Sequence, residues 1–141
     1  MKLKRLTLTD IEYVAHRLAQ ETMSWREPIP DFGTRYSNAL ERCIDAPFQS
    51  FGGKQLYPGL VRKASILFYL MIKNHPFQNG NKRLAMTTLF FFLFRNKKWM
   101  KVDTQELYNF AVWVAKSNAK VRADTIRAVE TFLGSYIVDI E

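Results

Sequence analysis

The sequence predicts an all-α domain, in which a short β-hairpin-like flap precedes a central pair of helices. Two nearly all-apolar stretches, 60–72 and 84–94, indicate core helices, because a bilayer span takes about 20 apolar residues. Apolar residues recur at helical spacing on both sides of this pair. Of the 141 residues, 48% are hydrophobic and 14% aromatic, which is enough for one core, so we expect a single domain over residues 1–141.

The elements before the central pair are set by a cap and by prolines. Helical spacing predicts a first helix over 9–22, with Thr9 as its cap and Glu12 completing a capping box. After a proline-containing loop, a short helix is expected over 35–44, closed by the proline that follows, because the residue before proline avoids the helical region. Aromatic residues around a Gly-Gly pair then predict an irregular hairpin or flap over 48–57.

The central pair and the later helices follow from similar signals. A helix is expected over 58–74, because a proline suits the first helical position and the following residues are almost all apolar. Its partner is expected over 81–94. Thr104 should cap another amphipathic helix, and either Asp124 or Thr125 should open the last one.

Charge and cysteine content limit the classes of partner and compartment. The 21 Lys and Arg residues outnumber the 13 Asp and Glu residues, giving a net charge of +8 that favours nucleotides, nucleic acid, acidic proteins or anionic lipid without choosing among them. The single cysteine, Cys43, excludes an intramolecular disulfide and a cysteine-rich zinc site. No signal-peptide pattern opens the sequence, so we expect a cytoplasmic protein with no membrane partner.

The stretch 75–83, HPFQNGNKR, joins the central helices and places Lys82 and Arg83 in a first helical turn, where the macrodipole is already positive. A bound anion would offset this repulsion. Gly80 allows a positive φ and close backbone approach, and the free amides after it converge at the helix start. Arg83 can grip phosphate oxygens bidentately while Lys82 adds a point charge. His75 can serve as a base, because an imidazole ordinarily titrates near neutrality.

The composition alone leaves a plainer interpretation of this stretch open. Asn79-Gly80 is a common turn sequence, Pro76 can simply end a helix, and cations at a helix start can be solvated charge. Phe77 is expected to anchor the loop in the core.

HPFQNGNKR resembles the signature of Fic/Doc proteins, His-Pro-Phe-x-(Asp or Glu)-Gly-Asn-(Gly or Lys)-Arg. The upstream stretch FGGKQLYPGLVRKASILFYLMIKNH is similar to the flap and preceding helix of the Doc-like branch. The resemblance implies transfer of a phosphate-containing group from ATP to a hydroxyl side chain of a target protein. Lys82 and Met86 stand where adenylyl-transferring relatives carry Gly and a second Arg, which favours a Doc-like toxin that phosphorylates a translation elongation factor. AMP transfer is the alternative.

The resemblance also implies roles for individual residues. Carried over one by one, the signature implies a general base at His75, a core anchor at Phe77, an anion hole at Gly80 and Asn81, and phosphate contacts at Lys82 and Arg83. The flap would register the target segment by strand-like pairing. Its residues are Phe51, Gly52, Gly53, Lys54, Gln55 and Leu56. The family's inhibitory helix motif does not occur, which implies a separate antitoxin protein.

Asn79 departs from the signature, because the family places its acidic magnesium ligand there. An amide oxygen can coordinate Mg²⁺, but it lacks the charge attraction that hard cations favour. A second hypothesis is therefore a binding module that senses a nucleotide or a partner without efficient catalysis.

The remaining candidates carry simpler expectations. His16 is expected to be a packed or surface histidine, and the aromatic residues at 108, 110 and 113 are expected in the core or at an antitoxin interface. The basic cluster over 95–101, which contains Trp99, supports a third hypothesis of nucleic-acid binding. A solvated helix end explains such a cluster more often, so nucleic acid is not the expected partner.

Overall fold

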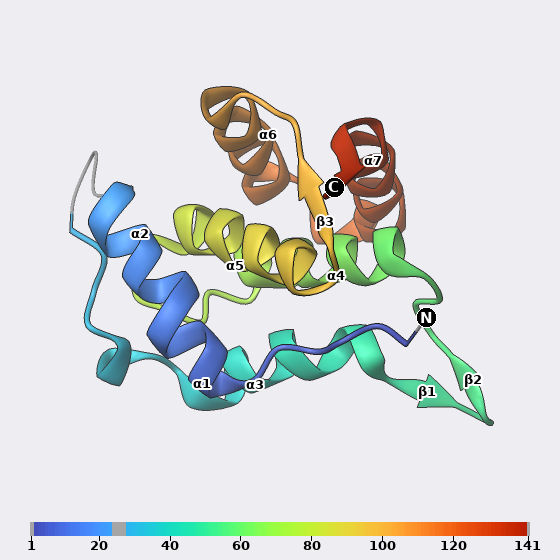
Figure 1. Ribbon diagram of the computed structural model, residues 1–141, viewed down its shortest axis with the longest axis horizontal. Coiled ribbons are helices and arrows are strands. Elements are labelled where there is room, and N and C mark those ends of the chain that lie inside the picture. The colour runs from blue at the N-terminus through green and yellow to red at the C-terminus, as the bar shows by residue number, and fades with distance from the viewer. Residues whose placement is uncertain (1, 24–27, 141) are drawn as a thin grey trace.

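The computed structural model describes residues 2–23 and 28–140, and its fold is all-α, as the sequence predicts (Figure 1). Two helices, α4 (Leu60–Lys73) and α5 (Asn81–Arg95), lie side by side at the centre. Ten residues of each are buried. The N-terminal helices and α3 lie on one side of this pair, and α6 and α7 lie on the other. None of the helices in the described part of the chain is long and apolar enough to cross a membrane.

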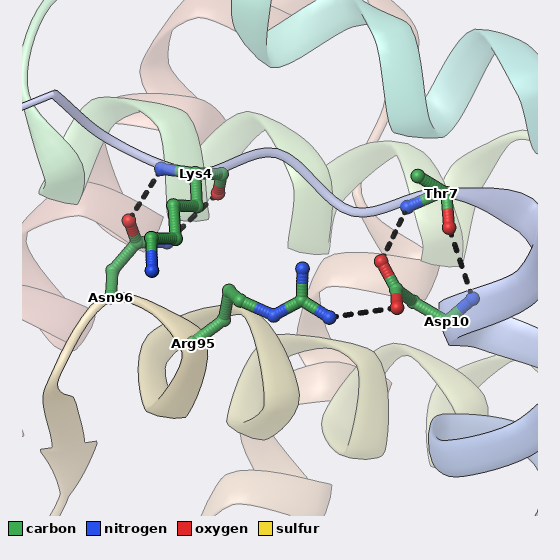
Figure 2. A network of polar contacts seen from close by, with 5 residues as sticks. All are labelled: Lys4, Thr7, Asp10, Arg95 and Asn96. Carbon is green, nitrogen blue, oxygen red and sulfur yellow. Dashed lines mark hydrogen bonds and ion pairs between the residues drawn. The ribbon is translucent and has the colours of Figure 1, made fainter.

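The N-terminal helical segment comprises α1 (Leu8–Asp10), the π-helical η1 (Ile11–His16) and α2 (Arg17–Thr22). Its cap is Thr7, so the prediction of Thr9 is wrong. The Thr7 hydroxyl accepts a hydrogen bond from the Asp10 amide at 3.2 Å, and the Asp10 carboxylate accepts one from the Thr7 amide at 2.9 Å (Figure 2).

A contact from α5 supports the capping box formed by Thr7 and Asp10. Asp10 also accepts a hydrogen bond from Arg95 Nη2 at 2.8 Å, which the spacing of the sequence cannot reveal (Figure 2). The neighbouring Asn96 fixes the chain before α1. Its Oδ1 accepts a hydrogen bond from the Lys4 amide at 2.7 Å, and its Nδ2 donates to the Lys4 carbonyl at 3.0 Å. The N-terminal segment is therefore tied to the end of α5.

The next element, α3 (Ser37–Asp45), begins two residues later than expected because Arg35 is extended. It follows the 3₁₀ turn η2 (Phe32–Thr34) and is followed by a second 3₁₀ turn, η3 (Ala46–Phe48). Cys43 of α3 is buried, and burial raises the pKa of its thiol to about 12. This thiol is a packing group.

The predicted hairpin is confirmed. Strands β1 (Ser50–Phe51) and β2 (Lys54–Gln55) pair antiparallel, with Phe51 opposite Lys54. The two turn residues are glycines with φ of 58° and 80°, as tight two-residue hairpin turns require. At its other end the hairpin is tied to α4, because Nζ of the buried Lys63 donates to Gln55 Oε1 and to the Tyr57 carbonyl, each at 2.6 Å.

The central helix α4 begins at Leu60, so the expectation that it begins at Pro58 is wrong. Gly59 is the cap, and its φ of 86° lies outside the helical region. Pro58 therefore lies in the turn before the helix. The partner helix α5 extends one residue beyond the predicted Phe94.

The C-terminal part comprises α6 (Thr104–Lys116), η4 (Ala119–Val121) and α7 (Arg122–Tyr136). Asp103, rather than Thr104, caps α6 by accepting a hydrogen bond from the Glu106 amide at 3.1 Å. The last helix begins two residues before Asp124.

A second strand pair, which the sequence does not predict, forms from β3 (Lys98–Met100) and β4 (Ile137–Asp139). The strands are antiparallel, with Trp99 opposite Val138. Each is three residues long, too short for an alternating pattern to stand out from a basic loop.

Candidate functional site

A cavity of about 560 Å³ lies where the loop between α4 and α5 meets α6. The predicted residues His75, Asn79, Gly80, Asn81, Lys82 and Arg83 all line it, together with Gln78. Its remaining lining residues are Ile72 of α4 and Tyr108, Val112, Ala115 and Lys116 of α6. None of the described residues that line it is acidic, so the cavity favours an anionic ligand.

Gly80 allows the chain to turn into α5. It caps this helix in the left-handed conformation, with φ of 75°. A Cβ at this position would lie 2.9 Å from Ile29 Cδ1 and 3.4 Å from Arg83 Nη2. The left-handed conformation therefore favours glycine here, and any side chain at this position would displace the end of Ile29.

Asn81 holds the loop with its side chain. Its Oδ1 accepts a hydrogen bond from the Phe77 amide at 2.9 Å, and its Nδ2 donates to the Phe77 carbonyl at 2.8 Å. Phe77 is fully buried, with its ring 5.5 Å from that of His16 and 6.0 Å from that of Phe32. The side chain of Asn81 is thus engaged within the loop, and what it can offer an anion is its backbone N–H.

His75 lies between the end of α4 and the anchored part of the loop. Its φ of 47° is left-handed, which is uncommon for a residue other than glycine. Directly after it, the Pro76 carbonyl accepts a hydrogen bond from the Tyr36 amide at 2.8 Å. His75 is exposed at the cavity, so a macromolecular substrate could reach it.

The first turn of α5 carries two cations and no acidic residue. Arg83 is buried, and its Nη1 donates to the Met23 carbonyl at 2.8 Å, which fixes the guanidinium beside the cavity. Lys82 is partly exposed. The helix dipole, its free amides and these two side chains all add positive potential at one end of the cavity.

Asn79 offers an oxygen to the cavity. Its Oδ1 is buried and has no hydrogen-bond partner among the described residues. An orphaned oxygen at this place fits a single neutral ligand for Mg²⁺, an ion that also takes substrate phosphates and water as ligands. Within the described part of the chain, no group of three or more His, Cys, Asp or Glu residues could hold a metal ion.

The hairpin residues Phe51–Leu56 do not line this cavity, and their role in positioning the target stays a prediction. The hairpin precedes α4, whereas His75 follows α4, and a helix of 14 residues is about 21 Å long. Instead, the segment 28–36 borders the loop, through Ile29 at Gly80 and the Tyr36 amide at Pro76. The hairpin and the loop both adjoin α4 in the sequence, but they lie at opposite ends of this helix, and only the loop end lines the cavity.

His16 supports this bordering segment from η1 and is a packed histidine. Its Nε2 lies 2.7 Å from the Pro30 carbonyl, and its ring meets Phe32 edge-on at 5.4 Å. Burial lowers the pKa of His16, while the Pro30 carbonyl and the charges of Asp31 and Glu12 act in the opposite direction.

The wall formed by α6 is the part of the site that the sequence does not reveal. Lys73 Nζ donates to the Ala115 carbonyl at 3.2 Å and to the Ser117 carbonyl at 2.7 Å, which joins the ends of α4 and α6. Tyr108 and Val112 precede Ala115 in α6 at helical spacing, so all three side chains lie on the face of α6 that lines the cavity. That spacing predicts a shared face, but no local signal says that the face meets the loop.

Comparison with known proteins identifies one family. Residues 5–93 match the family model described as the Fic/DOC family, which covers more than half of the chain and includes the whole loop. The matched region ends within α5, so the wall formed by α6 lies beyond it. No curated protein and no solved structure matches the chain.

Proposed function

We propose that this chain, which belongs to the Fic/DOC family, transfers a phosphate-containing group from ATP to a hydroxyl side chain of a target protein. The observation that carries the proposal is the cavity beside His75, whose lining combines cations, free helix amides and apolar side chains. Its volume of about 560 Å³ is in the range of small-molecule sites.

The two kinds of wall suit the two parts of a nucleotide. Lys82, Arg83 and the amides at the start of α5 would hold phosphate oxygens through charge-assisted hydrogen bonds. Ile72 and Val112, with the ring of Tyr108, supply an apolar surface for a base. The repulsion between two cations and a helix N-terminus is then offset by the ligand.

His75 would act as the general base. It takes the proton from the target hydroxyl as the hydroxyl oxygen attacks phosphorus, and the bond from phosphorus to the leaving phosphate oxygen breaks. Such proton transfer contributes roughly 10²–10⁴ in rate. Positioning of the phosphates by Arg83 supplies the alignment that the displacement needs.

Magnesium is proposed as the metal partner of the nucleotide. Asn79 Oδ1 would hold it, because this oxygen is buried, lines the cavity and lacks a partner among the described residues. When bound, Mg²⁺ neutralises phosphate charge as a Lewis acid.

Transfer of the terminal phosphate to a translation elongation factor, as in the Doc-like branch, is our preferred form of the reaction. Two residues of α5 support this form. Lys82 is one, and the other is Met86, a fully buried residue that stands one turn further along the helix where a second arginine would favour AMP transfer. AMP transfer is the alternative. A separate antitoxin protein would restrain the activity.

Labelled ATP tests the proposal. The chain is incubated with a bacterial lysate and with ATP labelled at the α or the γ phosphate, in parallel with His75→Asn, which keeps a residue that tolerates a positive φ. Asn74→Ala is the matched control, as an exposed neighbour outside the lining. We expect transfer of the γ label only, lost in His75→Asn. Transfer of the α label would indicate AMP transfer, and no label dependent on His75 would overturn the proposal.

A binding module is the second candidate, favoured by the neutral Asn79 at the metal position. In that case the native chain binds a nucleotide without transferring label, and Asn79→Asp creates magnesium-dependent transfer. Transfer by the native chain eliminates this candidate.

A further inference from the structure

The strand pair β3–β4 and the end of α5 form an exposed apolar surface, which we call the Trp99 face. It surrounds a hollow of about 430 Å³ lined by Phe94, Trp99, Lys101, Val138, Asp139 and Ile140. The apolar members are between 37% (Val138) and 58% (Phe94) exposed. Alternation along β3 explains the arrangement, because Met100 points into the core while Trp99 points outward beside its strand partner Val138. Exposed apolar patches with polar rims mark interaction sites.

The charges at this face are not balanced. Of the basic cluster expected from the sequence, Arg95 is paired with Asp10, and Lys98 is paired with Asp139. Lys97 and Lys101 are exposed and form no ion pair within the described part of the chain. An apolar hollow is thus accompanied by two available ammonium groups.

We propose that the Trp99 face docks an acidic amphipathic segment of a partner protein. The apolar side chains of the segment fill the hollow against Trp99 and Phe94, and its carboxylates meet Lys97 and Lys101. Aromatic side chains in partly formed pockets are the usual anchors of protein interfaces, and complementary charge fixes the register.

A second copy of this chain fits the face poorly. A two-fold interface places the same patch on both sides, so each copy would bring its Lys97 and Lys101, which are unpaired among the described residues. The carboxylate of Asp139 is already paired with Lys98. Like charges across an interface oppose association, and the chain as a whole carries +8. An acidic partner removes this repulsion.

Nucleic acid also fits less well than an acidic segment. One side of the Trp99 ring is stacked on Phe90, with ring centroids 5.3 Å apart and an angle of 22°. The pairing of Arg95 and Lys98 removes two of the cations that phosphates would need. The structure therefore favours a protein partner over the nucleic-acid hypothesis.

The test uses the full ¹⁵N-labelled chain and two synthetic peptides that share the same leucines at helical spacing and carry either glutamate or lysine between them. The glutamate peptide should shift the Trp99 indole resonance and the amides of Val138 and Ile140, and the lysine peptide should not. Lys101→Glu should weaken binding by at least about tenfold, because it reverses a charge at the hollow. Phe94→Ser, which alters a mostly exposed side chain, should do the same without unfolding the chain.

Matched controls are Trp113→Ser and Lys120→Glu, which change exposed side chains outside the Trp99 face and should leave the affinity unchanged. Equal binding of both peptides would overturn the proposal, as would an unshifted Trp99 resonance. Tighter binding of oligouridylate at the same resonances would instead make the face a nucleic-acid site. A dimer in sedimentation that Phe94→Ser disrupts would make it a self-association site, and either result contradicts an acidic protein partner.

Discussion

The two ends of α4 carry similar turns in different surroundings. Gly53 before the helix and Gly80 after it both have positive φ, of 80° and 75°. Each turn is also tied down by a buried polar side chain, Lys63 at the hairpin and Asn81 at the loop. However, a Cβ at Gly53 would have nothing among the described residues within 4 Å, whereas one at Gly80 would meet Ile29.

This difference shows that a glycine turn becomes a site through what packs against it. The hairpin stands in solvent, and Phe51 at its turn is 81% exposed. The loop is enclosed by α6 and by the segment 28–36, and it places His75 and Arg83 at one cavity. A hollow of about 400 Å³ also lies at the hairpin end, where Gln55 and Lys63 line it, but no histidine is among its described lining residues. We therefore assign the chemistry to the loop end.

The largest expected effect separates the two ends by activity. His75→Asn should lower the initial rate of label transfer about 10²–10⁴-fold, because it removes the base. Phe51→Ala should leave the rate within about twofold if the hairpin does not position the target. Both variants should unfold at the same urea concentration as the native chain, because both side chains are exposed. An equal loss of rate in Phe51→Ala would show that the target also contacts the hairpin.

The next effect compares the two glycines. Gly80→Ala adds left-handed strain of about 1–2 kcal/mol and overpacking against Ile29 of about 1–3 kcal/mol, so the free energy of unfolding should fall by about 2–5 kcal/mol. Gly53→Ala meets only the strain and should cost about 1–2 kcal/mol. Urea denaturation at equilibrium measures both. Equal losses would mean that Ile29 moves aside without cost and that the loop is not tightly enclosed.

A third comparison removes the polar ties. Asn81→Ala leaves the buried Phe77 amide and carbonyl without their partner and should cost about 2–3 kcal/mol of unfolding free energy. At the other end, Gln55→Ala removes one acceptor from Lys63, which keeps the Tyr57 carbonyl, and should cost about 1 kcal/mol. Unfolding in urea again measures the difference. A larger loss in Gln55→Ala would make the hairpin the more rigid end.

The sequence predicts the residues of the loop end better than their enclosure. The signature places a base, a glycine and two cations within nine residues, and all of them line one cavity. The α6 wall and the segment 28–36 reach the loop through contacts distant in sequence, such as that of Lys73 with Ser117. No local pattern encodes those contacts. The sequence also predicts the hairpin turn from its Gly-Gly pair. It does not predict that the hairpin lies at the opposite end of α4 from the loop.

Element boundaries show the same limit. Thr7 and Thr9 each precede an acidic residue by three positions, and local spacing cannot choose between them. Arg95, which is 85 positions from Asp10, supports the box at Thr7 (Figure 2). Strands β3 and β4 likewise form because they pair with one another, and their three-residue sequences carry no strand signal of their own.

The smallest expected effect tests the packing of the segment 28–36 at the loop end by pH. Burial lowers the pKa of His16 from its usual value of 6.5, against the opposing Pro30 carbonyl, Asp31 and Glu12. The unfolded chain therefore takes up this proton first as the pH falls below about 6.5, so stability present above that pH is lost on acidification.

In His16→Gln the urea midpoint should change less between pH 7.5 and pH 5.5 than in the native chain, and Phe51→Ala should keep the native change. Amide protection factors, which correct for the slower intrinsic exchange at acid pH, should fall in the segment 28–36 and not in the hairpin, because His16 contacts Pro30. If both ends of α4 loosen together, or if His16→Gln keeps the native pH dependence, this histidine does not hold the bordering segment.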